Sequence, residues 1–328
     1  MHTTMIYDAY FHNDFDGRAS AAVMLAFLRS RGDDIAHFVP VNFDLTKQWL
    51  DDRFFARHAL FKGPRNPAIV LDFPYHPGAA IWFDHHPTAF KKEEWKKKFR
   101  KDKFHRLDPE YLSNCHLTYT ALKENFGWKP PARFKDLVKW LDVIDGARFV
   151  SAEQTIMLKE PALQVMAYVD GTEDDLSATV AFVKLLAEEP LGEIAELKAV
   201  KAMAKAAQKE NLKGLAYYRK HLKVIGDASL IDLSGTEISS LRFAPYYLHP
   251  GVLYAVRLTK KGKFYHLGVG ANPWLKGALR KKHADVHIGE LMRKFGGGGH
   301  KNAGACEISS KRAVRAAIDA IVPVLNGK

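Results

Sequence analysis

The stretch Ile81-Trp-Phe-Asp-His-His-Pro-Thr88 joins an apolar run to an acid and two adjacent imidazoles, and Pro87 ends it. The run Ala79–Phe83 has the length and composition of a buried strand. Packing alone does not require Asp84, His85 and His86 at the end of such a strand. Because neighbouring residues of an extended segment point to opposite sides, the two histidines need not share one role.

Other apolar segments of strand-like composition end on polar residues in the same way. They span residues 9–11, 37–41 and 68–73, and a helix rich in Ala, Leu and Met is expected over residues 18–31. Strands that alternate with helices predict an α/β layer, with a mostly parallel sheet flanked by helices. Ligands of such sheets bind beyond the carboxyl ends of the strands, where these polar residues gather.

The pattern changes twice along the rest of the chain. Helical spacing dominates from residue 112 to about 223, and residues 191–215 are expected to form one extended helix. Strand-like segments follow at 228–232, 253–258 and 264–268, with a closing helix at 311–325. We therefore expect an α/β domain at residues 1–190, a helical connector at 191–222 and a smaller α/β domain at 223–328.

The composition points to a cytoplasmic protein with an anionic partner. Its two cysteines, Cys115 and Cys306, are too far apart for a CxxC motif, which argues against a disulfide framework or a thiolate zinc cluster. No apolar run has the length of a membrane span, and the first residues lack the pattern of a secretory signal. The formal charge of +12 suggests a polyanionic partner. The densest basic run, Lys91–Lys103, is either a solvated helical face or a surface that attracts phosphates.

A second polar group is the stretch HNDFDG at residues 12–17. In an extended segment the spacing i, i+2, i+4 would place His12, Asp14 and Asp16 on one face. Carboxylates gathered in this way need a cation to offset their repulsion. The alternative is an ordinary helix start, with Asp16 near the N-cap and Gly17 easing the turn.

Single acids complete the set of candidate ligands. Asp72 ends the run AIVLDF, and Asp145 precedes a small-residue turn that ends at Arg148. Each alone has a structural alternative, as a cap or turn residue. Together with the two other clusters they give four carboxylates and at least two imidazoles, a mixed set that suits Mn²⁺ or a similar divalent ion. Two such ions would explain the number of ligands, and in-line displacement at phosphorus is the chemistry they serve.

The stretch FGGGGHKNAGA at residues 295–305 is a candidate phosphate cradle. Glycines expose backbone N–H groups, and the side chains of His300 and Asn302 are further donors. A flexible linker is the alternative, but its surroundings would be rich in serine. The stretch differs from a P-loop because no GK[ST] follows.

These motifs resemble those of the DHH phosphoesterase superfamily, in the branch with a C-terminal DHHA1 domain that includes RecJ-like and nanoRNase-like proteins. HNDFDG is similar to the first motif of that family, Asp72 to the second, DHHPT to the third and the Asp145 region to the fourth. FGGGGHKNAGA is similar to the GGGH motif of DHHA1, and Val269–Trp274 to the strand and loop before it. The resemblance spans nearly the whole chain. It implies that residues 1–190 are a DHH catalytic domain and residues 223–328 a DHHA1 substrate-binding domain.

The resemblance also implies a role for each matched residue. One metal ion would be held by His12, Asp14 and Asp72, and the other by Asp16, Asp72, His85 and Asp145, with Asp72 bridging. The catalytic pair would be His86, facing the substrate phosphate, and Asp84, supporting the site from behind. The substrate's terminal phosphate or nucleotide would be bound by Gly297, Gly298, Gly299, His300 and Asn302, and Arg148 is a further candidate. Asp108 and His116 lie outside the motifs and are expected to be structural.

We therefore expect a phosphodiesterase that hydrolyses short oligonucleotides or dinucleotides by two-metal in-line attack, with nucleotide phosphatase activity as an additional prospect. The expected cofactor is two Mn²⁺ ions, with Mg²⁺ or Co²⁺ as substitutes. A RecJ-like exonuclease specific for single strands is the main alternative, favoured by the positive charge. An exopolyphosphatase is a third option, and a non-catalytic nucleotide-binding regulator is the option outside enzymes. A homodimer is compatible with all of these, and none involves a membrane.

Overall fold

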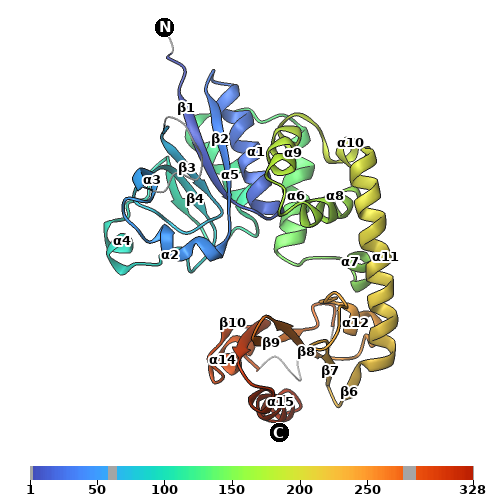
Figure 1. Cartoon of the computed structure of the whole chain (residues 1–328). Helices are drawn as coiled ribbons and strands as arrows, with labels where there is room; N and C mark the ends of the chain where they lie inside the picture. The colour runs from blue at the N-terminus through green and yellow to red at the C-terminus, as the bar shows by residue number, and fades with distance from the viewer. Residues whose placement is uncertain (1–2, 58–64, 276–285, 328) are drawn as a thin grey trace. The chain divides into compact units, whose positions relative to one another are not determined.

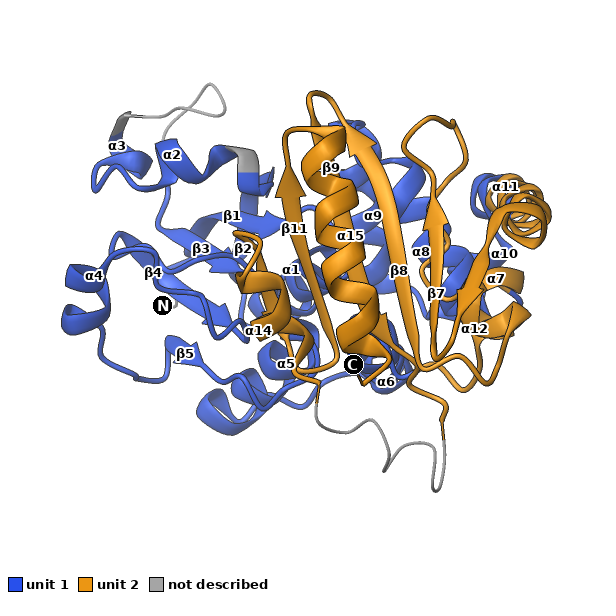
Figure 2. Cartoon of the chain, turned by 90° about the horizontal axis from the view of Figure 1, so that it is seen from below, with its two compact units in different colours: residues 1–148, 159–204 blue, residues 149–158, 205–328 orange. Residues whose placement is uncertain are grey.

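The computed structural model describes residues 3–57, 65–275 and 286–327. The chain divides into two compact units (Figure 2). Unit 1 comprises residues 1–148 and 159–204, and unit 2 comprises residues 149–158 and 205–328. The chain passes from the first unit to the second inside a helix, α11 (Lys198–His221), which lies in the expected connector range. The expected domain limits at residues 190 and 222 stay predictions.

Unit 1 is built on a parallel sheet of five strands, which confirms the expected α/β layer and adds a strand, residues 105–107, that was not expected. The strands are β1 (Ile6–His12), β2 (Asp34–Val41), β3 (Ala68–Leu71), β4 (Ala79–Asp84) and β5 (His105–Leu107). Their order in the sheet is β2-β1-β3-β4-β5, and every neighbouring pair is parallel. The carboxyl ends of β1, β3 and β4 therefore meet at one edge of the sheet, and the sequence motifs follow these three ends.

Alternate residues of the central strands pack into separate cores on the two faces of this sheet. Phe11, Leu71 and Phe83 pack under one set of helices, and Tyr10 and Trp82 pack under another. The first face is covered mainly by α1 (Phe15–Arg29), α5 (Asn114–Phe126), α6 (Arg133–Asp145), α8 (Pro161–Gly171) and α9 (Leu176–Glu188) (Figure 1). The second face carries the short helices η1 (Phe43–Leu45), α2 (Thr46–Trp49), α3 (Phe54–Arg57) and α4 (Glu93–Lys98).

The start of α1 corrects one expectation. Strand β1 ends at His12 and α1 begins at Phe15, so His12, Asp14 and Asp16 do not share one extended segment. Asp14 is the N-cap of α1 and accepts a hydrogen bond from the Gly17 amide, which stabilises the helix start. Position 17 requires glycine, because a Cβ there would collide with the backbone of His12.

Unit 2 contains a mixed sheet of six strands. They are β6 (Lys223–Ile225), β7 (Ala228–Asp232), β8 (Tyr254–Lys261), β9 (Phe264–Ala271), β10 (Gly298–His300) and β11 (Ala303–Ile308), in the order β10-β11-β9-β8-β7-β6. Only β7 and β8 pair in parallel. Helix α15 (Lys311–Leu325) crosses one face of this sheet (Figure 2). The remaining described helices of the unit are α7 (Ala152–Met157), α12 (Ala244–Leu248), α14 (Ile288–Arg293) and most of α11.

The single helix expected over residues 191–215 is wrong. The segment forms α10 (Leu191–Glu196) and then α11, because Leu197 between them has an extended backbone with ψ of 136°. None of the described helices is both long and apolar enough to cross a membrane.

Candidate functional site

The end of β3 places Asp72 at the centre of the polar cluster in unit 1. Its backbone has φ of +56°, a left-handed conformation that non-glycine residues adopt at a cost and that is common at functional sites. The Asp72 amide donates a hydrogen bond to the carbonyl of Phe83 on the next strand, which fixes this turn. The side chain is 2% exposed, and its Oδ1 has no hydrogen-bond partner among the described residues.

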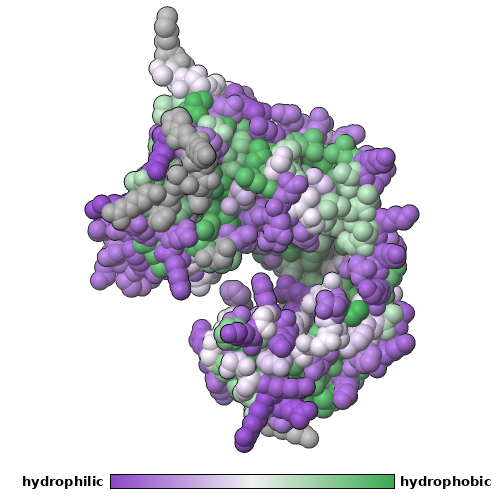
Figure 3. All heavy atoms as spheres, viewed as in Figure 1, coloured by the Kyte–Doolittle hydropathy of each residue, from purple (hydrophilic) through white to green (hydrophobic). Residues whose placement is uncertain are grey.

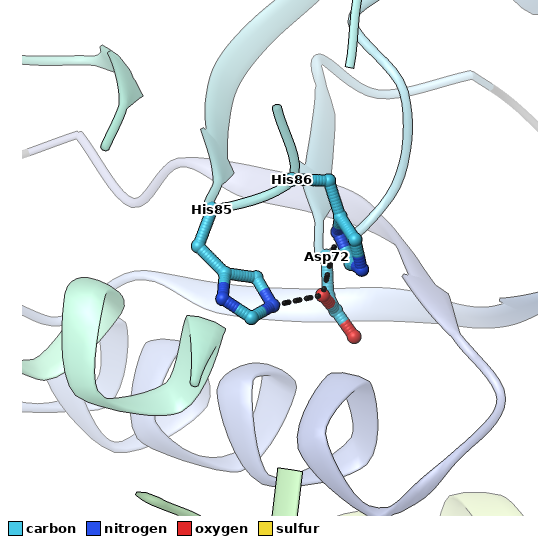
Figure 4. Close-up of side chains that lie close together, drawn as sticks. All are labelled: Asp72, His85 and His86. Atoms are coloured by element: carbon cyan, nitrogen blue, oxygen red, sulfur yellow. Dashed lines mark ion pairs between the residues drawn. The ribbon is translucent and has the colours of Figure 1, made fainter. Parts of the chain in front are cut away.

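Both histidines at the end of β4 approach Asp72 (Figure 4). His85 Nε2 lies 3.6 Å and His86 Nδ1 lies 3.5 Å from the same oxygen, Asp72 Oδ1. The two side chains differ in exposure, at 9% for His85 and 41% for His86. Neighbouring side chains at this strand end therefore do not point to opposite sides, but one imidazole is buried and the other faces outward.

Separate groups hold the two rings. His85 Nδ1 lies 3.0 Å from the carbonyl oxygen of Tyr111, so this nitrogen donates a proton and Nε2 is turned toward the carboxylates. His86 Nδ1 lies 2.8 Å from Asp84 Oδ1, which also accepts the His86 backbone amide. Asp84 is fully buried and supports His86 rather than His85.

His85 Nε2 is the point on which three carboxylates converge. It lies 3.5 Å from Asp145 Oδ2, 3.6 Å from Asp72 Oδ1 and 3.8 Å from Asp16 Oδ2, and it has no hydrogen-bond partner among the described residues. These separations exceed those of hydrogen bonds. They match atoms that share one cation, because ligands about 2.1 Å from an ion lie roughly 3–4 Å from each other.

Three groups of side chains in unit 1 have this ligand-like spacing, with donor atoms within 4.8 Å of one another: His12, Asp14 and Asp72; Asp16, His85 and Asp145; and Asp72, His85 and His86. The first group is joined by His12 Nδ1, which lies 2.8 Å from Asp14 Oδ2 and 3.7 Å from Asp72 Oδ2. In the second group, Asp16 accepts the backbone amides of Asn114 and Cys115 at the start of α5, where the helix N-terminus favours a negative charge. The structure thus brings together every residue that the resemblance assigns to metal binding.

The electrostatics of the cluster favour a cation. Burial raises the pKa of Asp72 well above its usual range, and the nearby carboxylates of Asp16 and Asp14 raise it further. Burial and Asp145 act on the pKa of Asp16 in the same direction. Buried carboxylates without a partner are costly, and bound divalent ions would remove both the repulsion and the unpartnered atoms. The oxygen and imidazole donors fit ions such as Mn²⁺ or Mg²⁺ better than they fit thiophilic metals.

Arg148 lies outside these groups. It follows α6 on an exposed turn, where its amide donates to the carbonyl of Val143. Its side chain forms no ion pair with a described carboxylate. The proposed phosphate contact of Arg148 therefore stays a prediction.

A second candidate site is a pocket of about 620 Å³ in unit 2. Alternate residues of its sheet explain the pocket. Residues 254, 256 and 258 of β8, with 267 of β9, pack with α15, whereas residues 255 and 257, with 266, 268 and 270, face the pocket. Because the pocket face of β9 carries glycine at 268 and 270, the sheet is hollow there. Arg257 pairs with Gly268, and its guanidinium lies over the space that a side chain at position 268 would fill.

The lining of the pocket is positively charged. It contains Arg242, Arg257 and His266 but no carboxylate, and neither arginine forms an ion pair with a described residue. Burial lowers the pKa of the Arg257 guanidinium, and Arg242 adds to this effect, so an anionic ligand would be favoured. The aromatic ring of Phe243 lies at the wall, with the Arg242 guanidinium 5.2 Å from its centroid.

The glycine stretch contributes only in part to this pocket. Gly298, Gly299 and Asn302 line it, whereas Gly297 and the exposed His300 do not. Position 299 requires glycine, because its φ is +144° and a Cβ would collide with the carbonyl of Ala303. Sequence reasoning missed Arg242, Arg257 and His266. The signal for the last two was the period-2 alternation of Gly268 and Gly270 against buried Leu267 and Val269.

No family model matches the chain, and no curated protein resembles it in sequence. Several solved structures are similar to it in fold. A pGpG-specific phosphodiesterase, PggH from Vibrio cholerae, aligns over 98% of this chain and 99% of its own, with a TM-score of 0.68 and 21% identity. A DHH domain from a member of a family of ribosomal proteins aligns over 98% of this chain and 87% of its own, with a TM-score of 0.58 and 15% identity.

The chain has a DHH-type fold. RecJ from Thermus thermophilus in complex with Mn²⁺ shares this fold, with a TM-score of 0.54 and 14% identity over 98% of this chain and 52% of RecJ. The adjacent parallel strands β1, β3 and β4 account for the polar residues that meet at their carboxyl ends.

Proposed function

We propose that the chain is a divalent-metal-dependent phosphodiesterase that cleaves dinucleotides and short oligonucleotides. The observation that carries this proposal is the convergence of buried, unpartnered Asp72 Oδ1 and His85 Nε2 with the carboxylates of Asp16 and Asp145. The similarity to PggH over nearly the full length of both chains supports the choice of a small substrate. The similarity to RecJ, solved with Mn²⁺, supports a divalent ion.

The proposed metal ligands form two sets that share Asp72. His12, Asp14 and Asp72 would hold one ion, and Asp16, Asp72, His85 and Asp145 the other. When bound, two such ions would stabilise negative charge on the transferring phosphoryl group, as Lewis acids do in other two-metal sites. Mn²⁺ is our choice for the native ion, with Mg²⁺ or Co²⁺ as substitutes.

The protein groups around the ions orient the substrate. Asp84 holds the His86 ring through Nδ1, which leaves Nε2 of this half-exposed side chain to face a phosphate oxygen. His85 is held by the Tyr111 carbonyl, so its Nε2 stays directed at the carboxylates. This division of labour predicts that His85 serves metal binding and His86 serves turnover.

The pocket of unit 2 would bind the terminal nucleotide. Arg257 and Arg242 supply positive charge for a phosphate, and the backbone of Gly298 and Gly299 adds close N–H donors. Phe243 offers an aromatic face for a base. A pocket of about 620 Å³ suits one terminal nucleotide better than a continuous strand.

One observation favours the second candidate, an exonuclease acting on single strands. Lys96, Lys97 and Lys98 of α4 are exposed and form no ion pair with described residues, whereas Lys92 pairs with Asp52. The surface over α4 is hydrophilic (Figure 3). Unpaired lysines of this kind bind phosphate backbones through counterion release.

The test is a substrate panel with purified protein and Mn²⁺. It contains a linear dinucleotide, a cyclic dinucleotide, 3′-phosphoadenosine phosphate, single strands of graded length, and polyphosphate. We expect the highest kcat/KM for the linear dinucleotide, a steep fall with length, and full loss of activity in a chelator. Rates that rise with length would instead favour the exonuclease, and activity that survives the chelator would refute metal dependence.

A further inference from the structure

A single short segment, Tyr111–His116, supports all three side chains of one ligand group. The carbonyl of Tyr111 holds the His85 ring at 3.0 Å. The amides of Asn114 and Cys115 hold the two carboxylate oxygens of Asp16, the latter at 2.8 Å. These contacts fix two of the three members of the group Asp16, His85 and Asp145 directly.

The third member, Asp145, is reached through the next helix. Its carboxylate forms no hydrogen bond with a described residue, so its position depends on where the last turn of α6 lies. That turn is anchored by Asp142, whose Oδ1 accepts the Ser113 hydroxyl at 2.8 Å and whose Oδ2 lies 2.8 Å from His116 Nδ1. Residues three apart on a helix share a face, so a shift of Asp142 moves Asp145 with it.

Ser113, His116 and Asp142 form a connected hydrogen-bond network. Ser113 is fully buried, caps α5 by accepting the His116 amide, and donates its hydroxyl proton to Asp142. The His116 ring packs edge-on against Tyr111 with centroids 5.0 Å apart. The His116–Asp142 pair therefore connects the segment that holds His85 and Asp16 to α6, the helix that carries Asp145.

The other ligand group receives less support from this segment. Asp14 accepts the Gly17 amide and lies beside His12, and both belong to the junction of β1 and α1. No described side-chain hydrogen bond of His12 or Asp14 goes to residues 111–116. The segment reaches this group only through Asn114, whose side-chain oxygen, in the orientation that satisfies its neighbours, accepts the backbone amide of Asp72 at 3.0 Å.

We propose that Tyr111–His116 positions Asp16 and His85 in one metal site, and that the His116–Asp142 pair sets the position of Asp145 in the same site. The inference rests on the proposed function, because it presumes that the two ligand groups bind divalent ions. It assigns a positioning role to His116, which lies outside every sequence motif. Residues that orient metal ligands typically change affinity by about 10–100-fold when removed.

The test is Mn²⁺ titration by calorimetry on the full chain, with His116→Ala, His116→Asn and a control, His105→Ala. His105 also forms a short pair with an aspartate, at 3.0 Å from Asp102, but neither residue contacts a ligand. We expect His116→Ala to weaken one of two binding events by about 10–100-fold and to leave the other unchanged. His116→Asn, which can still donate to Asp142, should restore much of the affinity, and His105→Ala should bind both ions as the wild type does.

Three results would overturn the inference. His116→Ala could bind both ions with wild-type affinity, it could lose both to the same degree, or His105→Ala could match its loss. Melting curves in a chelator show whether each variant is folded, and any folded variant gives a decisive titration. A wild-type chain that binds no divalent ion refutes the proposed function itself, whereas equal losses at both sites refute only the selective role of the segment.

Discussion

Replacing Asp72 by asparagine tests how the negative charge of this residue changes the stability of the fold without metal and with metal bound. Asparagine has the same shape and tolerates the left-handed backbone at this position, where φ is +56°. Asp72 Oδ1 has no hydrogen-bond partner to lose among the described residues. The variant therefore removes a negative charge with little other change. We expect Asp72→Asn to be more stable than the wild type without metal and less stable with it.

The size of the effect follows from the geometry. The oxygens of Asp72 and Asp16 lie 3.6 Å and 3.8 Å from His85 Nε2, so they are at most 7.4 Å apart, the sum of these distances. At an effective dielectric constant of about 20, two charges at that separation repel by about 2 kcal/mol. Removing this repulsion should raise Tm in a chelator by roughly 4–8 °C for a unit of this size.

The sign of the pH dependence is fixed by the direction of the pKa shift. Burial and the neighbouring carboxylates raise the pKa of Asp72 in the folded state, so the charged form destabilises the fold above the unfolded pKa. The stability lost in this way returns as pH falls through the raised folded pKa. The gap between variant and wild type in a chelator should therefore close as the solution is acidified.

Thermal melts in a chelator and in Mn²⁺ provide the assay. At an Mn²⁺ concentration one hundred times Kd, binding stabilises the wild type by about 2.7 kcal/mol. Asp72→Asn should gain much less, because Asp72 would serve both ions. A variant that is less stable than the wild type in the chelator, yet gains the same Tm from Mn²⁺, would refute this reasoning.

Three further predictions concern the metal cluster, the pocket of unit 2 and the lysines of α4. His85→Ala should lower the Mn²⁺ content measured after gel filtration, whereas His86→Ala should mainly reduce kcat; equal loss of metal in both would show that the division of roles is wrong. Arg257→Gln should raise KM for a dinucleotide at least tenfold without changing metal content, since an ion contact to phosphate is lost; an unchanged KM would exclude the unit 2 pocket as the nucleotide site. Replacing the three lysines of α4 by glutamine should reduce the salt dependence of binding to a ten-nucleotide strand by about two units of log–log slope, with no effect on dinucleotide turnover; unchanged slopes would mean that this surface is only solvated. The last change covers Lys96, Lys97 and Lys98.

The sequence could place the ligands of the cluster because they lie at strand ends. The carboxyl ends of β1, β3 and β4 meet in any parallel sheet with neighbouring strands, so His12, Asp72 and His85 had to come together once the strands were recognised. The turn after Asp145 marked this residue as a candidate, but a helix C-terminus gives no geometric constraint, so only the resemblance placed it with the strand ends. The extended geometry assumed for residues 12–16 failed, since the capping preference of Asp14 ended the strand at His12.

The supporting residues could not be predicted in the same way. The partners of Asp16 are backbone amides of Asn114 and Cys115, nearly one hundred residues away, and backbone donors leave no mark on the side-chain pattern. His116 carried no local signal either, because its partner Asp142 lies on a different helix. Arg242 of the pocket in unit 2 lies in a turn before α12 and has no such signal, whereas the alternation of Gly268 and Gly270 was the signal for Arg257 on the paired strand β8.

The most direct measurement is the rate of cleavage of a linear dinucleotide in Mn²⁺ by the wild type and by Asp72→Ala, with gel-filtration profiles to show that both are folded. The proposed function predicts turnover in the wild type and its loss in the variant, because Asp72 would be a ligand of both ions. Cleavage by Asp72→Ala at a rate near that of the wild type would contradict the assignment of Asp72 as bridging ligand, and no turnover by the wild type would contradict the proposed function.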